Sequence, residues 1–208
     1  MKKIIFALLL MGLVPPLAAA GYVEGRHYLE IPFGGSPDTG DKVEVREFFW
    51  YGCPHCLTLE PIIDHWLKTK PKKALFLRTP AFLPRNTVHA KAFYTFESLG
   101  MTDKLHGEFF DAVQIRQRRM DDDASVIGFA VEHGVDEKTF TKAYNSFGVD
   151  IKVREAMMLA QKYGLSSVPT LVVDGRYLTT ATMAGGNGAV MQVVDHLVEK
   201  AAKERASR

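Results

Sequence analysis

The chain has 208 residues, of which 47% are hydrophobic and 24% charged, with a formal net charge of +2. These proportions exclude a disordered tail, a collagen-like fibre and a coiled coil, and the weak charge without a Lys/Arg stripe gives no support to nucleic-acid binding. The length fits one domain with a large insertion or two small domains, and two cysteines, Cys53 and Cys56, are too few for a disulfide-framework fold.

The first twenty residues have the layout of a secretory signal peptide. Lys2 and Lys3 precede an apolar run of 11 residues from Ile4 to Val14, and three alanines before Gly21 offer a cleavage site after Ala20. A membrane anchor is the alternative, but 11 helical residues reach only about 16 Å, roughly half of a bilayer core. Cleavage would remove two of the 26 basic residues and leave 24 basic against 24 acidic ones.

The segment from residue 28 to residue 80 predicts the order β-β-α-β. Strands are expected at residues 28–31, 43–50 and 74–79, and the second becomes apolar along its length, as in a strand that enters the middle of a sheet. A helix is expected to follow the two cysteines. Pro61 lies inside that helical pattern and should kink or interrupt it.

Residues 85–163 predict a compact helical block of about five helices, because apolar residues there recur at helical spacing and the strand signal is absent. Phe140, Ala143 and Phe147 are assigned to the fourth helix. Expected helix starts are at Thr102, Asp123 and Asp136, and expected ends are at Gly100, Gly134 and Gly164.

The strand signal returns after residue 164. Residues 170–173 and 176–179 flank Asp174-Gly175, a pair that suits a type I′ turn, and so predict a β-hairpin. An amphipathic helix follows, with its apolar stripe running from Val190 to Ala201. The complete order is therefore β-β-α-β, a helical block, and β-β-α.

The Cys53-Pro54-His55-Cys56 sequence is the candidate chemical element. Cys53 follows a strand and opens a helix, where free N–H groups and the helix dipole favour a negative charge. Pro54 suits the first helical turn, and the imidazole of His55 adds a second group that lowers the pKa of Cys53. Cys56, one turn later and more shielded, suits a resolving role.

Two cysteines in an exported protein usually form a structural bridge. A bridge across such a short loop restrains little unfolded-chain entropy, so redox chemistry explains the pair better. A stabilised thiolate favours the reduced state and makes the disulfide a stronger oxidant. Each pKa unit corresponds to about 1.4 kcal/mol, equivalent to about 30 mV for a two-electron couple.

The run from Glu47-Phe48-Phe49 to Cys53-Pro54-His55-Cys56, with Val168-Pro169-Thr170 later, resembles the DsbA family of exported thiol:disulfide oxidoreductases in the thioredoxin superfamily. The resemblance covers essentially all of the chain after residue 20. It implies an α/β, thioredoxin-like fold with an inserted all-helical domain. The thioredoxin-like domain would comprise residues 21–84 and 164–208, and the helical insertion residues 85–163.

The resemblance also implies roles for single residues. Val168-Pro169 would be a cis-proline loop facing the disulfide, with Val168 offering backbone hydrogen bonds to an extended substrate peptide. Cis bonds are a proline property, and Pro169 stands just before an apolar strand. Glu47 and Glu60 match acidic residues of the family near the active site, and a buried Glu47 would relay protons to Cys56.

Ordinary alternatives remain for these residues. Glu47 could be a solvated edge residue, and Glu60 could belong to a charged helix face.

Trp50, Tyr51 and Phe82 are candidates to line an apolar groove for substrate side chains, although most aromatic residues are core residues. A structural zinc site would need two ligands besides the cysteines, and the histidines outside the motif show no ligand spacing.

By the resemblance, we expect a monomeric, periplasmic dithiol oxidase that needs no cofactor besides its Cys53–Cys56 disulfide. Its substrates would be reduced, unfolded exported proteins, and a DsbB-like, quinone-linked membrane protein would reoxidise it. One alternative is a reductase or isomerase, although the 22 residues from Gly21 to Lys42 that precede Val43 are too few for an isomerase's dimerisation domain. Another is a non-catalytic peptide-binding or chaperone module with an inert bridge.

Overall fold

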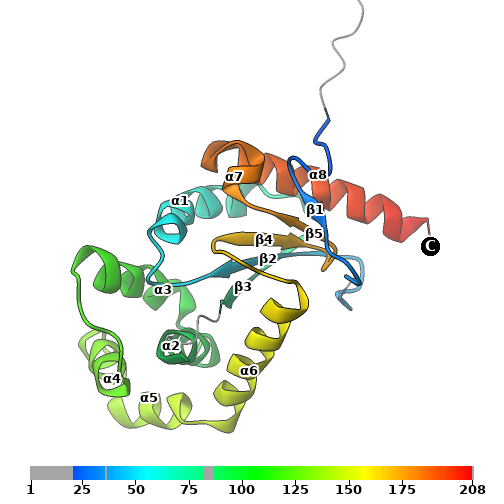
Figure 1. Ribbon diagram of the computed structural model, residues 1–208. Helices are drawn as coiled ribbons and strands as arrows, with labels where there is room; N and C mark the ends of the chain where they lie inside the picture. Colours follow the sequence, from blue (N-terminus) through cyan, green and yellow to red (C-terminus); the bar gives the residue numbers. More distant parts are fainter. Residues whose placement is uncertain (1–20, 36, 82–86, 208) are drawn as a thin grey trace, which may run out of the picture.

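A computed structural model describes residues 21–35, 37–81 and 87–207, with a five-stranded mixed sheet at its centre (Figure 1). The strands are β1 (Leu29–Glu30), β2 (Val43–Phe49), β3 (Ala74–Pro80), β4 (Thr170–Val173) and β5 (Tyr177–Thr179). Their order across the sheet is β1-β5-β4-β2-β3, and β2 runs parallel to β3 and antiparallel to β4. All five predicted strands are confirmed; the predicted signal peptide lies outside the described residues.

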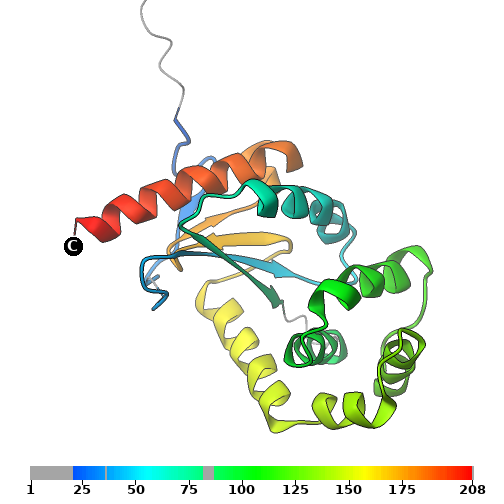
Figure 2. The same cartoon turned by 180° about the vertical axis from the view of Figure 1, so that it is seen from behind.

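Helices cover both faces of this sheet. They are α1 (Pro54–Thr69), α2 (Thr87–Ser98), α3 (Thr102–Phe110), the π-helix η1 (Asp111–Ile115), α4 (Asp123–Glu132), α5 (Glu137–Tyr144), α6 (Phe147–Lys162), α7 (Ala181–Ala184) and α8 (Asn187–Ala206). Helices α1, α7 and α8 lie on one face, and the group from α2 to α6 lies on the other side (Figures 1 and 2). The predicted helical block is confirmed as secondary structure, and its status as a separate domain stays a prediction.

Pro61 was predicted to kink or to interrupt its helix, and the interruption is wrong because α1 continues through Pro61. The kink stays a prediction. Proline removes one intrahelical hydrogen bond. The buried side chains of Leu59, Ile63 and Trp66 hold the helix against the sheet on both sides of that point. Tertiary packing therefore outweighs the local cost of the proline.

Two helix boundaries in the helical block differ from the prediction. Phe147 belongs to α6 and not to the fourth helix, because the Ser146 hydroxyl accepts the N–H of Val149 and starts a new helix there. Asp122, one residue before the expected Asp123, caps α4, whereas Asp136 caps α5 as predicted.

The β4–β5 turn has the predicted conformation. Asp174 and Gly175 have φ values of 57° and 63°, the left-handed values that a type I′ turn requires, and Arg176 N–H donates to the Val173 carbonyl at 3.0 Å. The ladder pairs Val173 with Tyr177, so Arg176 is one residue more than the minimal hairpin needs.

Strand β2 positions the candidate site. Val43 and Val45 belong to the hydrophobic cluster that includes α1 and α8, while Phe48 packs with Tyr163 on the opposite face. Because side chains alternate along a strand, Glu47 lies on the α1 face with Val43 and Val45. The carboxyl end of β2 leads directly into the two cysteines. No helix within the described ranges is long and apolar enough to cross a membrane.

Candidate dithiol active site

The two cysteines lie where β2 turns into α1. Cys53 N–H donates to the Trp50 carbonyl at 2.9 Å, which closes the turn, and Cys53 then occupies the N-cap position of α1. Its carbonyl accepts the N–H groups of Cys56 and Leu57 at 3.0 and 3.2 Å. Pro54 follows in the first helical turn, where a missing N–H leaves no hydrogen bond unmade.

Both cysteines are free thiols, and their environments differ. Cys53 is 7% exposed and Cys56 is fully buried, as their positions in the sequence predicted. A hydrogen bond from the Cys56 thiol is the largest influence on Cys53; with the N–H groups of Cys56 and His55 and the His55 charge, it outweighs burial and lowers the pKa of Cys53 to about 6. The helix start and His55 were predicted from the sequence, whereas the effect of the Cys56 thiol was not.

The pKa of Cys56 moves in the opposite direction. The hydrogen bond that it gives to Cys53 holds its proton, and burial and the negative charge of the Cys53 thiolate also raise its pKa. The site therefore contains one sulfur that ionises readily and one that retains its proton.

The Val168–Pro169 loop faces the dithiol. Its peptide bond is cis, which confirms the expected conformation. The Cys53 thiol donates to the Val168 carbonyl at 3.4 Å across 115 residues of sequence. Thr170 Oγ1 donates to the Ser167 carbonyl at 2.8 Å and ties the start of β4 to this loop.

A groove of about 660 Å³ opens beside this loop. His55, Val168 and Pro169 form one part of its lining, and residues 180–182 and 185–187, at the ends of α7, form the other. The second part was not predicted from the sequence, because α7 has only four residues and shows no helical periodicity.

Glu47 is fully buried on the α1 face of β2, in the inward position that was predicted. The Arg78 Nε atom is 3.3 Å from its carboxylate, and neither carboxyl oxygen accepts a hydrogen bond from the described residues. Burial, followed by the charge of Glu60, raises the pKa of Glu47 to about 8, although Arg78 opposes the shift.

Glu60 joins the same buried cluster from α1. It accepts from Arg78 Nη2 at 2.8 Å, and its other oxygen is 3.4 Å from Nε2 of His106. Burial alone would raise its pKa, but contacts with His106 and Arg78 outweigh burial and hold the pKa of Glu60 below its usual value. Arg78 thus bridges two carboxylates beneath the active-site helix.

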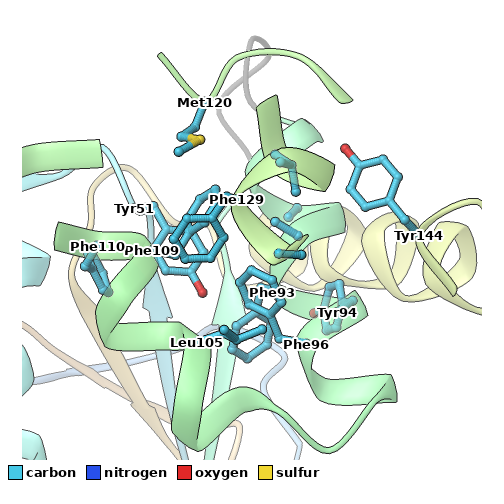
Figure 3. Close-up of a cluster of buried hydrophobic side chains, with 14 of the residues drawn as sticks. Tyr51, Phe93, Tyr94, Phe96, Leu105, Phe109, Phe110, Met120, Phe129 and Tyr144 are labelled. Atoms are coloured by element: carbon cyan, nitrogen blue, oxygen red, sulfur yellow. The ribbon is translucent and has the colours of Figure 1, made fainter. Parts of the chain in front are cut away.

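The proposal that Tyr51 lines a substrate groove is wrong. Tyr51 is fully buried and packs against Phe109 and Phe110, each with a ring-centroid separation of 4.7 Å (Figure 3). Its hydroxyl lies 2.8 Å from Nδ1 of His106. Tyr51 lies in the turn after β2, and its ring is a core residue of the cluster formed with the helical block.

The other two aromatic candidates have different outcomes. Trp50 is partly exposed, and its Nε1 donates to Nδ1 of His89 at 3.1 Å, so its role at the groove stays a proposal. Phe82 lies outside the described residues.

Four side chains around the site were not identified from the sequence: Arg78, His89, His106 and Gln114. They come from β3, α2, α3 and η1, and each contacts the active-site turn or the acidic cluster. The histidines were considered only as metal ligands, and no local pattern marks the other two. The described ranges contain no group of three or more His, Cys, Asp or Glu residues able to hold a metal ion.

The chain is similar to known proteins over most of its length. Residues 44–198 match the family of DSBA-like thioredoxin domains. The thiol:disulfide interchange protein DsbA of Azotobacter vinelandii is 35% identical, over 96% of this chain and 98% of its own length. The Burkholderia cepacia protein of the same name is 37% identical over 96% and 97%. The crystal structure of Pseudomonas aeruginosa DsbA aligns with a TM-score of 0.82 at 35% identity and covers 89% of this chain and 96% of its own.

Proposed function

The chain belongs to the family of DSBA-like thioredoxin domains, and from that premise we propose that it oxidises reduced proteins by donating a Cys53–Cys56 disulfide to them. The fold is thioredoxin-like α/β, and the enzyme is a thiol:disulfide oxidoreductase, in agreement with the names of its relatives. The direction of exchange and the roles of single residues are the parts that we propose.

The observation that carries the proposal is the asymmetry between the two thiols. The pKa of Cys53 falls to about 6, while the pKa of Cys56 is raised. At neutral pH the reduced enzyme therefore holds Cys53 as a thiolate. Stabilisation of this thiolate favours the dithiol form of the enzyme, which makes its disulfide oxidising.

In the first step, a substrate thiolate attacks Cys53 Sγ of the enzyme disulfide. A bond forms between the substrate sulfur and Cys53, the Cys53–Cys56 bond breaks, and Cys56 leaves with the electron pair and takes up a proton. Cys53 is the target because it is the less buried sulfur and contacts Val168, a residue that lines the groove.

In the second step, another substrate thiolate attacks the substrate sulfur of the mixed disulfide. Cys53 leaves as a thiolate, and the substrate departs with a new disulfide, so two electrons have passed to the enzyme. A thiol of low pKa is a good leaving group, which favours this step.

Glu47 is the proposed proton donor to Cys56. Its carboxyl is buried on the α1 face of β2, and it is near enough to Cys56 that its ionised form raises the pKa of that thiol. A pKa of about 8 keeps the Glu47 carboxyl protonated at neutral pH, so it has a proton to give. Glu60 tunes Glu47 through the Arg78 that they share. Pro54 and His55 tune Cys53 from the first turn of α1.

The groove beside Pro169 is the proposed binding site for an extended segment of substrate. Val168 would pair with the substrate backbone, and Trp50 would contact its side chains. A peptide bound there would pass within reach of Cys53, because the Val168 carbonyl already contacts Cys53 Sγ.

Export to the periplasm, a monomeric state and reoxidation by a DsbB-like, quinone-linked membrane protein complete the proposal. The signal-peptide pattern of residues 1–20 supports export. Cell fractionation followed by mass measurement tests export. A mature chain that begins at Gly21 in the periplasmic fraction supports it, and an uncleaved chain in the cytoplasmic fraction contradicts it.

The decisive experiment is equilibration of the purified protein with a glutathione redox buffer, combined with titration of thiolate absorbance at 240 nm. We expect Cys53 to ionise near pH 6 and the disulfide to be more oxidising than that of glutathione. Ionisation near 8.5, the value of an ordinary cysteine, would refute the proposal.

Turnover assays separate the alternatives. Oxidation of a dithiol peptide faster than by glutathione disulfide supports the oxidase, whereas faster insulin reduction than peptide oxidation indicates a reductase or isomerase. A Cys53→Ala variant that retains full function would indicate a non-catalytic binding module.

A further inference from the structure

Gln114 contacts the active-site turn from the helical block. Its Nε2 atom donates to the carbonyl of Tyr51 at 2.7 Å and to the carbonyl of Cys53 at 2.9 Å. In a glutamine side chain the NH₂ group donates two hydrogen bonds and the amide oxygen only accepts. Because both partners of Gln114 here are carbonyl oxygens, its NH₂ group must point toward them. One side chain thus holds the backbone on both sides of Gly52.

The backbone that carries Gln114 is irregular. Residues 111–115 form the π-helix η1, in which Arg116 N–H donates to the Asp111 carbonyl at 2.8 Å. Gln117 follows with a φ of 54°, unusual for a residue other than glycine, and its side-chain amide donates to the Gln114 carbonyl at 2.7 Å. Such single π-turns often occur at functional sites.

We propose that Gln114 is a positioning residue for thiol–disulfide exchange, which holds the Tyr51–Cys53 turn so that the first turn of α1 faces Cys53 Sγ. The inference rests on the proposed function and assigns part of the tuning of Cys53 to the helical block, 61 residues away in the sequence.

The Cys53 carbonyl explains how Gln114 acts on the sulfur. The same oxygen accepts the N–H groups of Cys56 and Leu57, the first hydrogen bonds of α1. The N–H groups of His55 and Cys56, which stabilise the Cys53 thiolate, belong to that helical turn. Restraint of the carbonyl therefore restrains the donors that face the sulfur.

Loss of the Gln114 donors should weaken the stabilisation of the thiolate without changing either cysteine. The disulfide should then be a weaker oxidant, because its reduced form is less favoured. The net effect of one neutral hydrogen bond corresponds to a change of about threefold to tenfold in an equilibrium constant. A tenfold change corresponds to about 30 mV.

Two substitutions test the inference. Gln114→Met keeps the length of the side chain without donors, and Gln114→Glu keeps its shape but presents a carboxylate to two carbonyl oxygens. Gln161→Met, at an exposed position on α6, is the matched control. For each protein, the glutathione equilibrium, the ionisation of Cys53 at 240 nm and the melting temperature are measured.

We expect Gln114→Met to make the disulfide about threefold to tenfold less oxidising and to raise the pKa of Cys53. Gln114→Glu should do both more strongly, because its charge also opposes the thiolate, and Gln161→Met should match the unmodified protein. A purely structural residue would lower the melting temperature without this ordered change in redox equilibrium.

Redox values for both Gln114 variants equal to those of the unmodified protein would overturn the inference and leave the proposed function intact. Failure of the unmodified protein to oxidise a dithiol peptide would instead count against the proposed function. The exchange rate of the Gln114 side-chain amide protons gives a test without substitution: protection relative to Gln161 supports the inference, and equal exchange overturns it.

Discussion

Replacement of Glu47 by Gln should remove a strong pH dependence of stability. Glu47 is fully buried, its carboxyl oxygens accept no hydrogen bond from the described residues, and the nearest cationic atom, Arg78 Nε, is 3.3 Å away. Burial and the charge of Glu60 raise its pKa from 4.5 to about 8. The neutral carboxyl is therefore the form that the folded protein prefers.

The sign of the effect follows from this raised pKa. The folded state binds the proton more tightly than the unfolded state, so the stabilisation is complete below pH 4.5 and is lost as pH rises through 8. Each pKa unit corresponds to about 1.4 kcal/mol, so ionised Glu47 should destabilise the folded state by up to about 5 kcal/mol. A glutamine side chain at this position would have no charge to desolvate at any pH.

The assay is urea unfolding of the reduced protein and its Glu47→Gln variant at pH values from 5 to 9. Cys53 acts in the opposite direction, because its lowered pKa adds stability as pH rises from 6 to 9. Comparison of the two reduced proteins cancels this contribution. We expect the stability of the variant, relative to the unmodified protein, to increase by several kcal/mol from pH 5 to pH 9.

Glu199→Gln is the matched control, because the Glu199 side chain is 48% exposed and pairs with Lys73 at the surface. Its free energy of unfolding, plotted against pH, should remain parallel to that of the unmodified protein. If the free energy of unfolding of Glu47→Gln also runs parallel to that of the unmodified protein from pH 5 to pH 9, Glu47 is already ionised in the folded protein over this range. That result would refute the reasoning.

Three further substitutions probe the turn around the dithiol and the β4–β5 hairpin. Tyr51→Phe removes the hydroxyl 2.8 Å from His106 Nδ1 and leaves a buried nitrogen unpaired, so urea unfolding should show a loss of about 1–3 kcal/mol; no loss would indicate that water replaces the hydroxyl. Gly52→Ala places a Cβ 2.3 Å from the Trp50 ring, so the indole must move away from its hydrogen-bond partner and its fluorescence should change; an unchanged spectrum would contradict this contact. Gly175→Ala forces an L-residue into a φ of 63° with a backbone oxygen at 2.4 Å, so the melting temperature should fall by several degrees, whereas an unchanged value would contradict the turn geometry.

Local patterns were sufficient to predict the order of the strands and of the longer helices, but not η1 or the four-residue α7. Strand β2, the helix that follows the cysteines and the Asp174-Gly175 turn depend on residues that are neighbours in the chain, so periodicity and turn chemistry identify them. The same reasoning places Cys53 at a helix start, where its ionisation is favoured. Boundaries were less certain where a cap such as Ser146 competes with a continuing apolar pattern.

The chain's sequence by itself determined which sulfur opens the helix and which face of β2 carries Glu47, because both follow from spacing along one or two elements. Only the tertiary structure decided what surrounds them. Gln114 meets the Tyr51 carbonyl across 63 residues, and Arg78 reaches Glu60 across 18. Alternation shows that a side chain points inward but not which distant group it meets there, and that neighbour sets its charge, its proton affinity and whether a ring such as Tyr51 is buried or exposed.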